Sequence, residues 1–559
     1  MNDRRPPALL RILPSFTDFA FLMPIVFLFG RMGGLRDLLS DCDTGWHIRT
    51  GEWIIANRHV PAGDIFSFSK TGQPWFAWEW LTDVVFAWLN SRGGLQAVVL
   101  FSILILALTF TALFRLLRTK SNPFVAIAIT MLAAAGSSIH WLARPHLFTL
   151  LFLVLFYTAL ERVRAGQTHW GRVPYLAILP VVTILWTNLH GGFFVGAILI
   201  GSYGAGEVLT LLFSGSVNAA ETRQQVIRRA TRYFLSASAC MAASLINPYT
   251  WHLHQHMLMY LRDPFNSQHI HEFLSPSFHH PSAIFFEAMM LLAGAAGVSS
   301  LAKGRFTEAL YMVAWAHGAL LAARNIPIFL IVASLPAAAV LEEGLERLPE
   351  WNVAGWLRRT VSKFLQVASE TASTDSVGRW HLISGLAMVL VAAVMYAPHP
   401  PHKFRAEFDP KVYPAAALAK LHGDANTRIF THDEWGDYLI WTSHKVFVDG
   451  RSDFYGDDFE QKYIDILNVS DGWETTLAKF GVDTILMPPN TPLAGALKVS
   501  SRWRMVYEDT VSVVYSQTAK SGATTSSLAA TNRGEVGRDR EVTKTQASDR
   551  AITDSKSKT

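Results

Sequence analysis

Long apolar stretches recur along most of this chain and are separated by short polar turns. Most are roughly 17 to 25 residues long, the length that a helix needs to cross a bilayer core of about 30 Å. We expect eleven such helices, near residues 16–38, 95–117, 122–141, 146–161, 173–190, 192–213, 230–247, 284–302, 307–322, 326–341 and 379–397. The pattern predicts an α-helical polytopic membrane protein whose membrane domain covers residues 1–397.

Basic residues fall in every second loop between these stretches. The clusters are Arg115/Arg118/Lys120, Arg162/Arg164/Arg172, Arg223/Arg228/Arg229/Arg232, Lys303/Arg305 and Arg347/Arg358/Arg359/Lys363/Arg379. Because loops rich in Lys and Arg stay on the cytoplasmic side, we predict a multi-pass protein of a bacterial-type inner (plasma) membrane with a cytoplasmic N-terminus. The first stretch has no small-residue cleavage site after it and is expected to stay as an anchor. The long first outer loop, 39–94, and everything after residue 397 would face outward.

Two segments of different composition follow the last apolar stretch, which ends at the prolines near Pro398. Residues 398–518 alternate short apolar runs with helical stretches, which predicts a small extracytoplasmic α/β domain. We expect strands near 427–431, 445–449, 483–487 and 505–516, and helices near 409–422, 458–467 and 473–480. Residues 519–559 are rich in Ser, Thr, Lys and Arg with few large apolar residues, which predicts a disordered tail.

The charge balance argues against a nucleic-acid partner. The chain has 49 Lys and Arg against 44 Asp and Glu, a net charge of +5, but the excess is spread over the inner loops and forms no single patch with stacking aromatics. Contact with anionic lipids of the bilayer explains it better. The two cysteines, Cys42 and Cys240, fall in a loop and in a membrane stretch, so no disulfide is expected between them.

Two carboxylates, Asp41 and Asp43, stand directly after the first membrane stretch. A charged carboxylate beside hydrocarbon costs a few kcal/mol, so such residues are functional candidates. Their alternate spacing lets them converge only in extended or turn backbone. His47 and Glu79 in the same loop are further candidates. The alternative is that Asp41 or Asp43 caps the following helix, which would occupy only one of the two.

Polar residues also occupy three short turns on the predicted outer side. These turns hold Arg144 with His146, His190 with two glycines after it, and Arg324. A guanidinium in dry surroundings can hold a phosphate through two N–H groups. Each arginine alone could instead reach out to lipid headgroups. Because the three turns share a side with Asp41 and Asp43, we predict one site there.

Other polar segments support weaker predictions. His252 and His256 lie four residues apart on an expected helix, but tetrahedral zinc needs three or four convergent ligands, so no metal site is assigned. No cofactor is predicted, and a divalent metal is the alternative. Residues 432–436 and 449–451 end predicted strands, where they could contact an acceptor polymer or simply form turns.

This layout resembles the GT-C superfamily of integral membrane glycosyltransferases. In that superfamily the first outer loop carries an acidic residue, often in an Asp-x-Asp-like setting, and lies on the membrane surface as amphipathic helices. The matching pattern here is Ser40-Asp41-Cys42-Asp43, followed by Gly45-Trp46-His47 and an expected surface helix over 79–90. Over roughly 16–341 the chain is most similar to the protein-mannosyltransferase-like and aminoarabinose-transferase-like branch. The Trp-Trp-Asp signature of oligosaccharyltransferases is missing, which argues against that branch.

The resemblance implies transfer of a sugar from a polyprenyl-phosphate-linked donor to an unknown extracytoplasmic acceptor. Asp43 would be the general base, and Asp41, Glu79 and His47 would orient the base or the sugar. The lipid phosphate would be bound by Arg144, His146, His190 and Arg324. Similarity of fold alone does not establish function, so two other classes stay open: a transporter or flippase of envelope lipids, and a non-catalytic membrane scaffold.

Overall fold

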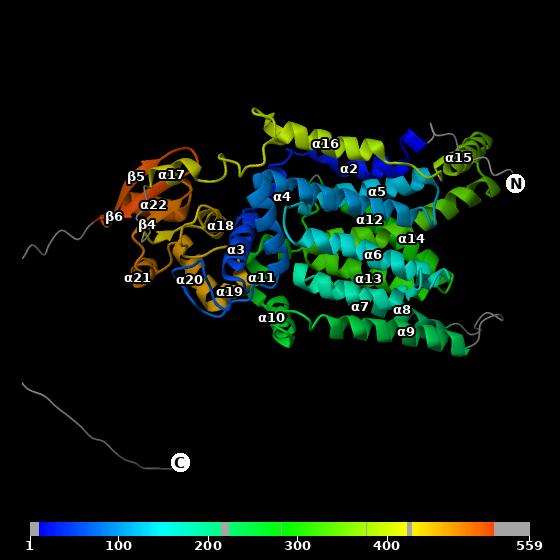
Figure 1. Ribbon diagram of the computed structural model, residues 1–559, viewed down its shortest axis with the longest axis horizontal. Coiled ribbons are helices and arrows are strands. Elements are labelled where there is room, and N and C mark those ends of the chain that lie inside the picture. The colour runs from blue at the N-terminus through cyan, green and yellow to red at the C-terminus, as the bar shows by residue number, and fades with distance from the viewer. Residues whose placement is uncertain (1–10, 214–222, 281, 376, 422–426, 519–559) are drawn as a thin grey trace, which may run out of the picture. The chain divides into compact units, whose positions relative to one another are not determined.

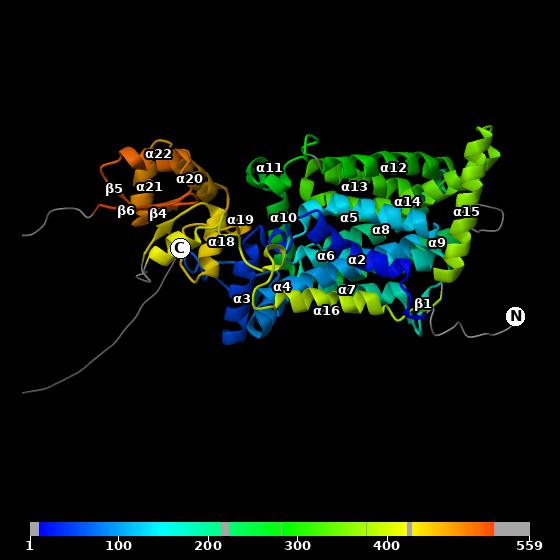
Figure 2. The ribbon, with the colours of Figure 1, turned by 90° about the horizontal axis from the view of Figure 1, so that it is seen from above.

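Every predicted membrane stretch contains a helix in the computed structural model, which describes residues 11–518 except 214–222, 281, 376 and 422–426. The helices are α2 (Phe16–Gly30), α4 (Trp80–Leu117), α5 (Pro123–Ser137), α6 (His146–Arg164), α7 (Tyr175–Leu189), α8 (Phe193–Phe213), α9 (Arg223–Ala243), α12 (Ala283–Ala302), α13 (Phe306–Leu321), α14 (Ile326–Arg347) and α16 (Leu382–Met395). They run side by side as one bundle (Figures 1 and 2). Their apolar faces meet in a continuous core that includes Tyr157, Trp186 and Phe329.

Six helical segments are long and apolar enough to cross a membrane. They are Trp80–Leu117, Pro123–His140, His146–Arg164, Phe193–Phe213, Ala283–Ala302 and Ala323–Glu350. Three further apolar helices, α2, α7 and α16, are shorter. The chain is therefore a multi-pass membrane protein, whereas the number of eleven spans stays a prediction.

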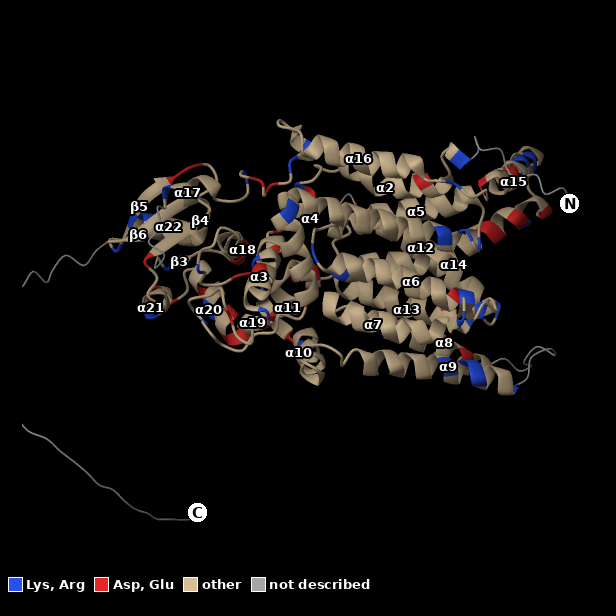
Figure 3. Cartoon of the chain, viewed as in Figure 1, with Lys and Arg blue, Asp and Glu red and all other residues tan. Residues whose placement is uncertain are grey.

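Charged residues gather at the two ends of the bundle and leave its middle apolar (Figure 3). The basic end holds the connections from α4 to α5, from α6 to α7 and from α12 to α13, and α15 (Gly355–Asp375) lies there. The acidic end holds α3 (Asp43–Asn57) and the turns of Arg144, His190 and Arg324. The basic clusters thus share one end, as predicted. Which membrane side each end faces stays a prediction.

A glycine pair divides α4 into two parts. Gly93 and Gly94 leave the helical conformation, and Gly94 has φ +67°, which favours glycine. Residues 80–92 therefore form a separate segment before the spanning part, where a surface helix over 79–90 was predicted. This segment packs closely on α3, since a Cβ at Gly51 would lie 1.9 Å from the carbonyl oxygen of Asp83.

The part after the bundle is a small α/β arrangement, as predicted. Its sheet has the order β3 (Ile429–Phe430), β4 (Thr484–Met487), β6 (Val513–Gln517) and β5 (Trp503–Glu508), with β3 and β4 parallel and the other pairs antiparallel. Its helices are α17 (Ala415–Lys420), α18 (Asp433–Trp441), α19 (Ser452–Tyr455), α20 (Asp457–Leu467), α21 (Trp473–Lys479) and α22 (Pro492–Val499).

Three local predictions for this part are wrong. The strand expected over 505–516 is a hairpin, because Asp509 accepts hydrogen bonds from the backbone of Val511 (2.8 Å) and Ser512 (2.7 Å) and turns the chain. The helix expected over 409–422 is only α17, which starts after Pro414. The strand expected over 445–449 makes only bridge pairs at Val446. The predicted tail, 519–559, lies outside the described residues.

The first loop contacts the α/β part through backbone hydrogen bonds and through a buried group of ion pairs. The Phe68 N–H donates to the Val446 carbonyl (2.9 Å), and the Val446 N–H donates to Phe66 (3.2 Å). The buried guanidinium of Arg451 pairs with Asp64 and with Asp449, each at 2.7 Å. Through such contacts the chain up to Gln517 forms one compact unit.

Candidate functional site

The start of α3 brings Asp41, Asp43 and Arg144 together. One oxygen of Asp41 accepts the Asp43 backbone N–H at 2.8 Å, and the other accepts Arg144 Nη1 at 2.7 Å. Nη2 of the same guanidinium pairs with Asp43. The first backbone N–H of α3, whose N-cap is Cys42, therefore occupies one oxygen of Asp41, while both predicted carboxylates converge on one arginine from the turn before α6.

Arg144 is held by carboxylates at both ends of its guanidinium. Burial opposes its charge, but Asp41 and Asp43 raise the pKa of Arg144 well above its ordinary value. The side chain is thus a permanent cation that positions Asp41 and Asp43. Any contact with a lipid phosphate, the role predicted for it, would use its remaining N–H groups or displace one carboxylate.

Asp437, at the buried face of α18, contacts Asp43 from the α/β part. The Gly450 N–H donates to Asp437 at 2.9 Å. A Cβ at Gly450 would lie 2.7 Å from Asp437 Oδ2 and 2.8 Å from Asp43 Oδ1, so only glycine lets the two carboxyl groups meet. Residues 449–451, singled out in the sequence as a strand end, thus lie against the site.

The two carboxyl groups are hydrogen-bonded to one another. Burial, and after it the negative charges of Asp43 and Asp449, raise the pKa of Asp437 well above its ordinary value. Burial also raises the pKa of Asp43 to about 8, although Arg144 and the hydrogen bond with Asp437 oppose this rise. A hydrogen bond between two carboxyl groups requires that one of them carries a proton, so Asp43 and Asp437 titrate as a pair.

A second chain of side chains runs beside this pair. His47 Nδ1 lies 2.6 Å from Asp83, and His47 Nε2 lies 3.6 Å from Glu79. The other oxygen of Glu79 lies 3.3 Å from His190 Nε2. Burial raises the pKa of Glu79 to about 8. Three of the predicted site residues, His47, Glu79 and His190, therefore form one connected row with Asp83.

The surroundings of His190 fix its tautomer. The Gly192 N–H donates to its Nδ1 at 2.9 Å. The Thr149 hydroxyl, which itself accepts from Trp186 Nε1 (2.9 Å), faces the same nitrogen at 2.7 Å. The proton of the neutral ring is thus on Nε2, toward Glu79. Burial, with the positive charges of Arg324 and Arg144, lowers the pKa of His190 to about 3, so it acts as a neutral donor.

Arg324 and His146 have their own partners. Arg324 Nη1 lies 3.1 Å from Glu272, and its guanidinium packs 4.4 Å from the centre of the Phe273 ring. Burial alone would raise the pKa of Glu272, but Arg324 and Arg144 lower it to about 2. His146 Nε2 instead faces the carbonyl of His140 at 2.8 Å. Arg324 thus belongs to the electrostatic surroundings of His190, whereas His146 is turned toward its own loop.

Asp437, Asp83 and Thr149 were not predicted from the sequence, and Glu272 was considered only as a possible partner of the metal-candidate histidines. Asp437 directly follows the 432–436 stretch that was singled out as a possible contact, and Asp83 lies one helical turn after Glu79, so these two had a sequence signal. Of the histidines considered for metal, His256 binds Asp453 at 2.8 Å and His252 is exposed. Within the described ranges, no group of three or more His, Cys, Asp or Glu side chains is arranged to hold a metal ion.

An apolar groove begins next to this row of side chains. It encloses about 570 Å³ and is lined by Trp80, Leu81, Val181, Ile184, Leu185, Asn188, Ile246, Asn247 and Pro248. Trp80 Nε1 donates to Asn188 at 2.7 Å at its inner side. Trp80 follows Glu79, and Asn188 lies two residues before His190. Val181 and Ile246, which are 65% and 59% exposed, form its outer rim.

Comparison with known proteins identifies no family from sequence: no protein-family model and no curated protein matches the chain. Among solved structures, the apo form of the oligosaccharyltransferase of Archaeoglobus fulgidus is similar, with 13% identity, 90% of this chain and 74% of that chain covered, and a TM-score of 0.48. The same enzyme in complex with zinc and sulfate gives 14% identity, coverages of 85% and 68%, and a TM-score of 0.46.

Proposed function

We propose that this protein is a membrane glycosyltransferase that moves a sugar from a polyprenyl-phosphate-linked donor to a hydroxyl group of an extracytoplasmic acceptor. The observation that carries the proposal is the Asp43 carboxyl group. It is buried at one end of a membrane bundle, its pKa lies near 8, and Asp437 and Arg144 hold it from two sides. A carboxylate with these properties has the form of a general base.

The proposed step is a direct displacement at the anomeric carbon. Asp43 takes the proton of the acceptor hydroxyl while the oxygen bonds to the anomeric carbon and the bond to the lipid phosphate breaks. Positioned base catalysis of this kind contributes about 10²–10⁴-fold in rate. The configuration at the anomeric carbon would invert, and recovery of a sugar covalently bound to Asp43 would contradict this mechanism.

The remaining site residues would act on the leaving group and on position. The departing phosphate gains negative charge, which His190 Nε2–H and the cations Arg144 and Arg324 can stabilise. Asp41, His47 and Glu79 would orient the base and the sugar. The apolar groove suits the polyprenyl chain, because apolar side chains make up most of its lining and its residues Trp80 and Asn188 stand close in sequence to Glu79 and His190. His146, which faces His140, would support the Arg144 turn.

We propose no cofactor for this reaction. Arg144 already supplies a positive charge between Asp41 and Asp43, where a divalent cation would otherwise sit. Transfer by the purified protein should therefore survive a chelator, and restoration of a lost rate by Mg²⁺ or Mn²⁺ would contradict this.

The two other function classes have less support. A transporter would place charged groups near the middle of its helices, but Glu207 lies toward the end of α8 and pairs with Arg229 at 2.7 Å. A scaffold would have no need for buried carboxyl groups with raised pKa values. Arg144→Ala should weaken handling of a phosphate-linked donor, yet it would leave transport of an uncharged solute intact.

The direct test follows the donor lipid. We expect cells that lack this protein to accumulate a polyprenyl-phosphate sugar, measured by mass spectrometry of lipid extracts. Cells with Asp43→Asn at matched expression should accumulate the same lipid, whereas the exposed-site control Glu370→Gln should not. If the lipid pool is unchanged in the deletion strain, the protein does not use such a donor.

A further inference from the structure

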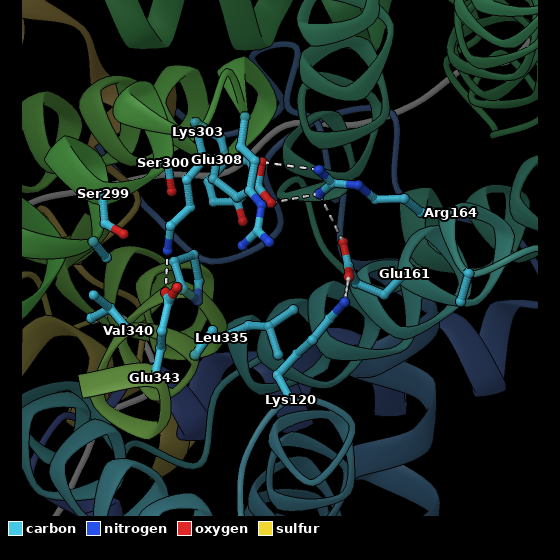
Figure 4. A pocket seen from close by; sticks show the side chains of 16 residues that line it. Lys120, Glu161, Arg164, Ser299, Ser300, Lys303, Glu308, Leu335, Val340 and Glu343 are labelled. Atoms are coloured by element: carbon cyan, nitrogen blue, oxygen red, sulfur yellow. Dashed lines mark hydrogen bonds and ion pairs between the residues drawn. The ribbon is translucent and has the colours of Figure 1, made fainter. Parts of the chain in front are cut away.

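Besides the apolar groove, the protein has a polar cavity, which lies at the basic end of the bundle, away from Asp43. It encloses about 310 Å³ between α6, α12, α13 and α14. Its charged lining residues are Lys120, Arg164, Lys303, Arg305, Glu161, Glu308 and Glu343. Figure 4 shows Lys303 reaching toward Glu343 on one side and Lys120 toward Glu161 on the other, so charged groups from both walls point into one space.

The carboxylates of this cavity are already neutralised by its walls. Arg164 binds both oxygens of Glu308, at 2.8 and 3.2 Å, and also lies 3.6 Å from Glu161. Lys303 pairs with Glu343. The hydroxyl of the buried Tyr203 donates to Glu161 at 2.6 Å. These pairs hold the walls in place before any ligand arrives, and they remove the repulsion that free carboxylates would exert on an anion.

One of the four basic groups, Arg305, is left without a carboxylate partner among the described side chains after this pairing. The Arg305 guanidinium makes no hydrogen bond or ion pair with any side chain that the structure describes. Lys120, whose side chain is 46% exposed, lies 3.6 Å from Glu161 and can turn toward a ligand. With four basic and three acidic residues the lining has one positive charge in excess. One phosphodiester would balance it, and an arginine can hold two of its oxygens at once.

The outer faces of the same helices are apolar and exposed. Val298 and Leu301 on α12 are 72% and 55% exposed, and Val313 on α13 is 71% exposed. Val298 and Leu301 flank Ser299 and Ser300, which line the cavity. Hydrocarbon chains can therefore lie along α12 and α13 while a polar headgroup enters between the helices, as in basic headgroup pockets at membrane surfaces.

We propose that this cavity binds the phosphodiester headgroup of an anionic phospholipid from the leaflet at the basic end. Arg305 and Lys120 hold the phosphate, and the Ser299 and Ser300 hydroxyls are placed to donate to it. The bound lipid would tie the α12–α13 connection, which holds Arg305, to the α4–α5 connection, which holds Lys120. This binding does not depend on the reaction proposed for the opposite end.

The test uses the full-length protein in nanodiscs of phosphatidylglycerol and phosphatidylcholine, with retained lipid counted by native mass spectrometry. We expect Lys120→Gln with Arg305→Gln to lower retained phosphatidylglycerol about tenfold, because charge-assisted hydrogen bonds to phosphate are lost. Arg305→Lys should keep most of it. The matched control is Arg172→Gln with Arg359→Gln, two exposed basic residues outside the cavity, which should retain the lipid.

Two results would overturn the proposal. Equal retention by the cavity variant and the wild type would show that the cavity does not hold the lipid, and equal loss in the control would show a general charge effect. A further arm adds inorganic phosphate, which we expect not to displace the lipid because the acyl chains contribute to binding. Displacement would identify free phosphate as the ligand and overturn the lipid assignment. Size-exclusion profiles of all variants show whether each is folded.

Discussion

The two ends of the bundle hold similar charged residues but differ in how the carboxyl groups are paired with basic side chains. At the basic end Glu308 and Glu343 each have an arginine or lysine partner. At the acidic end Asp43 and Asp437 are hydrogen-bonded to one another, and burial raises the pKa of Asp43 and of Glu79 to about 8. Ion pairs such as those at the basic end stabilise the fold or bind a ligand. Buried carboxyl groups with a pKa near the working pH can instead accept and release protons. The comparison supports the proposal that the reaction takes place at the acidic end.

The largest expected effect is the loss of transfer in Asp43→Asn. The amide cannot accept the proton of the acceptor, so the rate should fall about 10²–10⁴-fold. Release of polyprenyl phosphate from the accumulated donor measures this rate with purified protein. Glu308→Gln at the basic end should stay within a few-fold of wild type, and a comparable loss there would erase the contrast between the two ends.

The Glu79 and His190 pair should behave as one unit. We expect Glu79→Gln and His190→Ala each to lower transfer about tenfold, since His190 Nε2–H and Glu79 face one another at 3.3 Å. The double variant should be little worse than either single one, because the second change removes an interaction that is already lost. Fully additive losses in this cycle would show that the two side chains act separately.

The pH profile of transfer tests the hydrogen bond from Asp437. A general base works when deprotonated, so the wild-type rate should rise as pH increases through about 8, the pKa of Asp43. The hydrogen bond with Asp437 lowers that pKa, so in Asp437→Ala the rise should move to higher pH. Asp437→Asn keeps a donor and should stay close to wild type. An unchanged pH profile in Asp437→Ala would show that Asp437 does not affect the pKa of the catalytic base.

The smallest expected effect is on stability. The folded-state pKa of Asp437 lies well above its ordinary value of 3.8, so the folded protein keeps a proton that the unfolded chain releases. Stability contributed by this group therefore falls as pH rises above about 4. Asp437→Asn removes that cost and should raise the thermal midpoint at pH 8 but not at pH 4. By contrast, Glu308→Gln leaves Arg164 with only the more distant Glu161 as a carboxylate partner and should cost about 1–2 kcal/mol.

Much of the bundle could be predicted from sequence because each apolar stretch is long enough to require burial or lipid. The convergence of Asp41, Asp43 and Arg144 also followed, since alternating turns share a side. Asp437 could not be placed in the site, because pairing of the first loop with Val446 and the missing Cβ of Gly450 bring it there. The state of His190 likewise depends on Thr149 and Gly192, whose contacts no spacing reveals. His146 has the right position in sequence, but it faces a carbonyl of its own turn.

The most direct measurement of the central claim is a comparison of envelope glycans by mass spectrometry. Cells would carry the wild-type protein, a deletion, or Asp43→Asn at matched levels. The account predicts that Asp43→Asn loses the same sugar modification as the deletion, and the missing sugar would then name the donor. If Asp43→Asn keeps the modification that the deletion lacks, Asp43 is not the base, and the transporter or scaffold function would take its place.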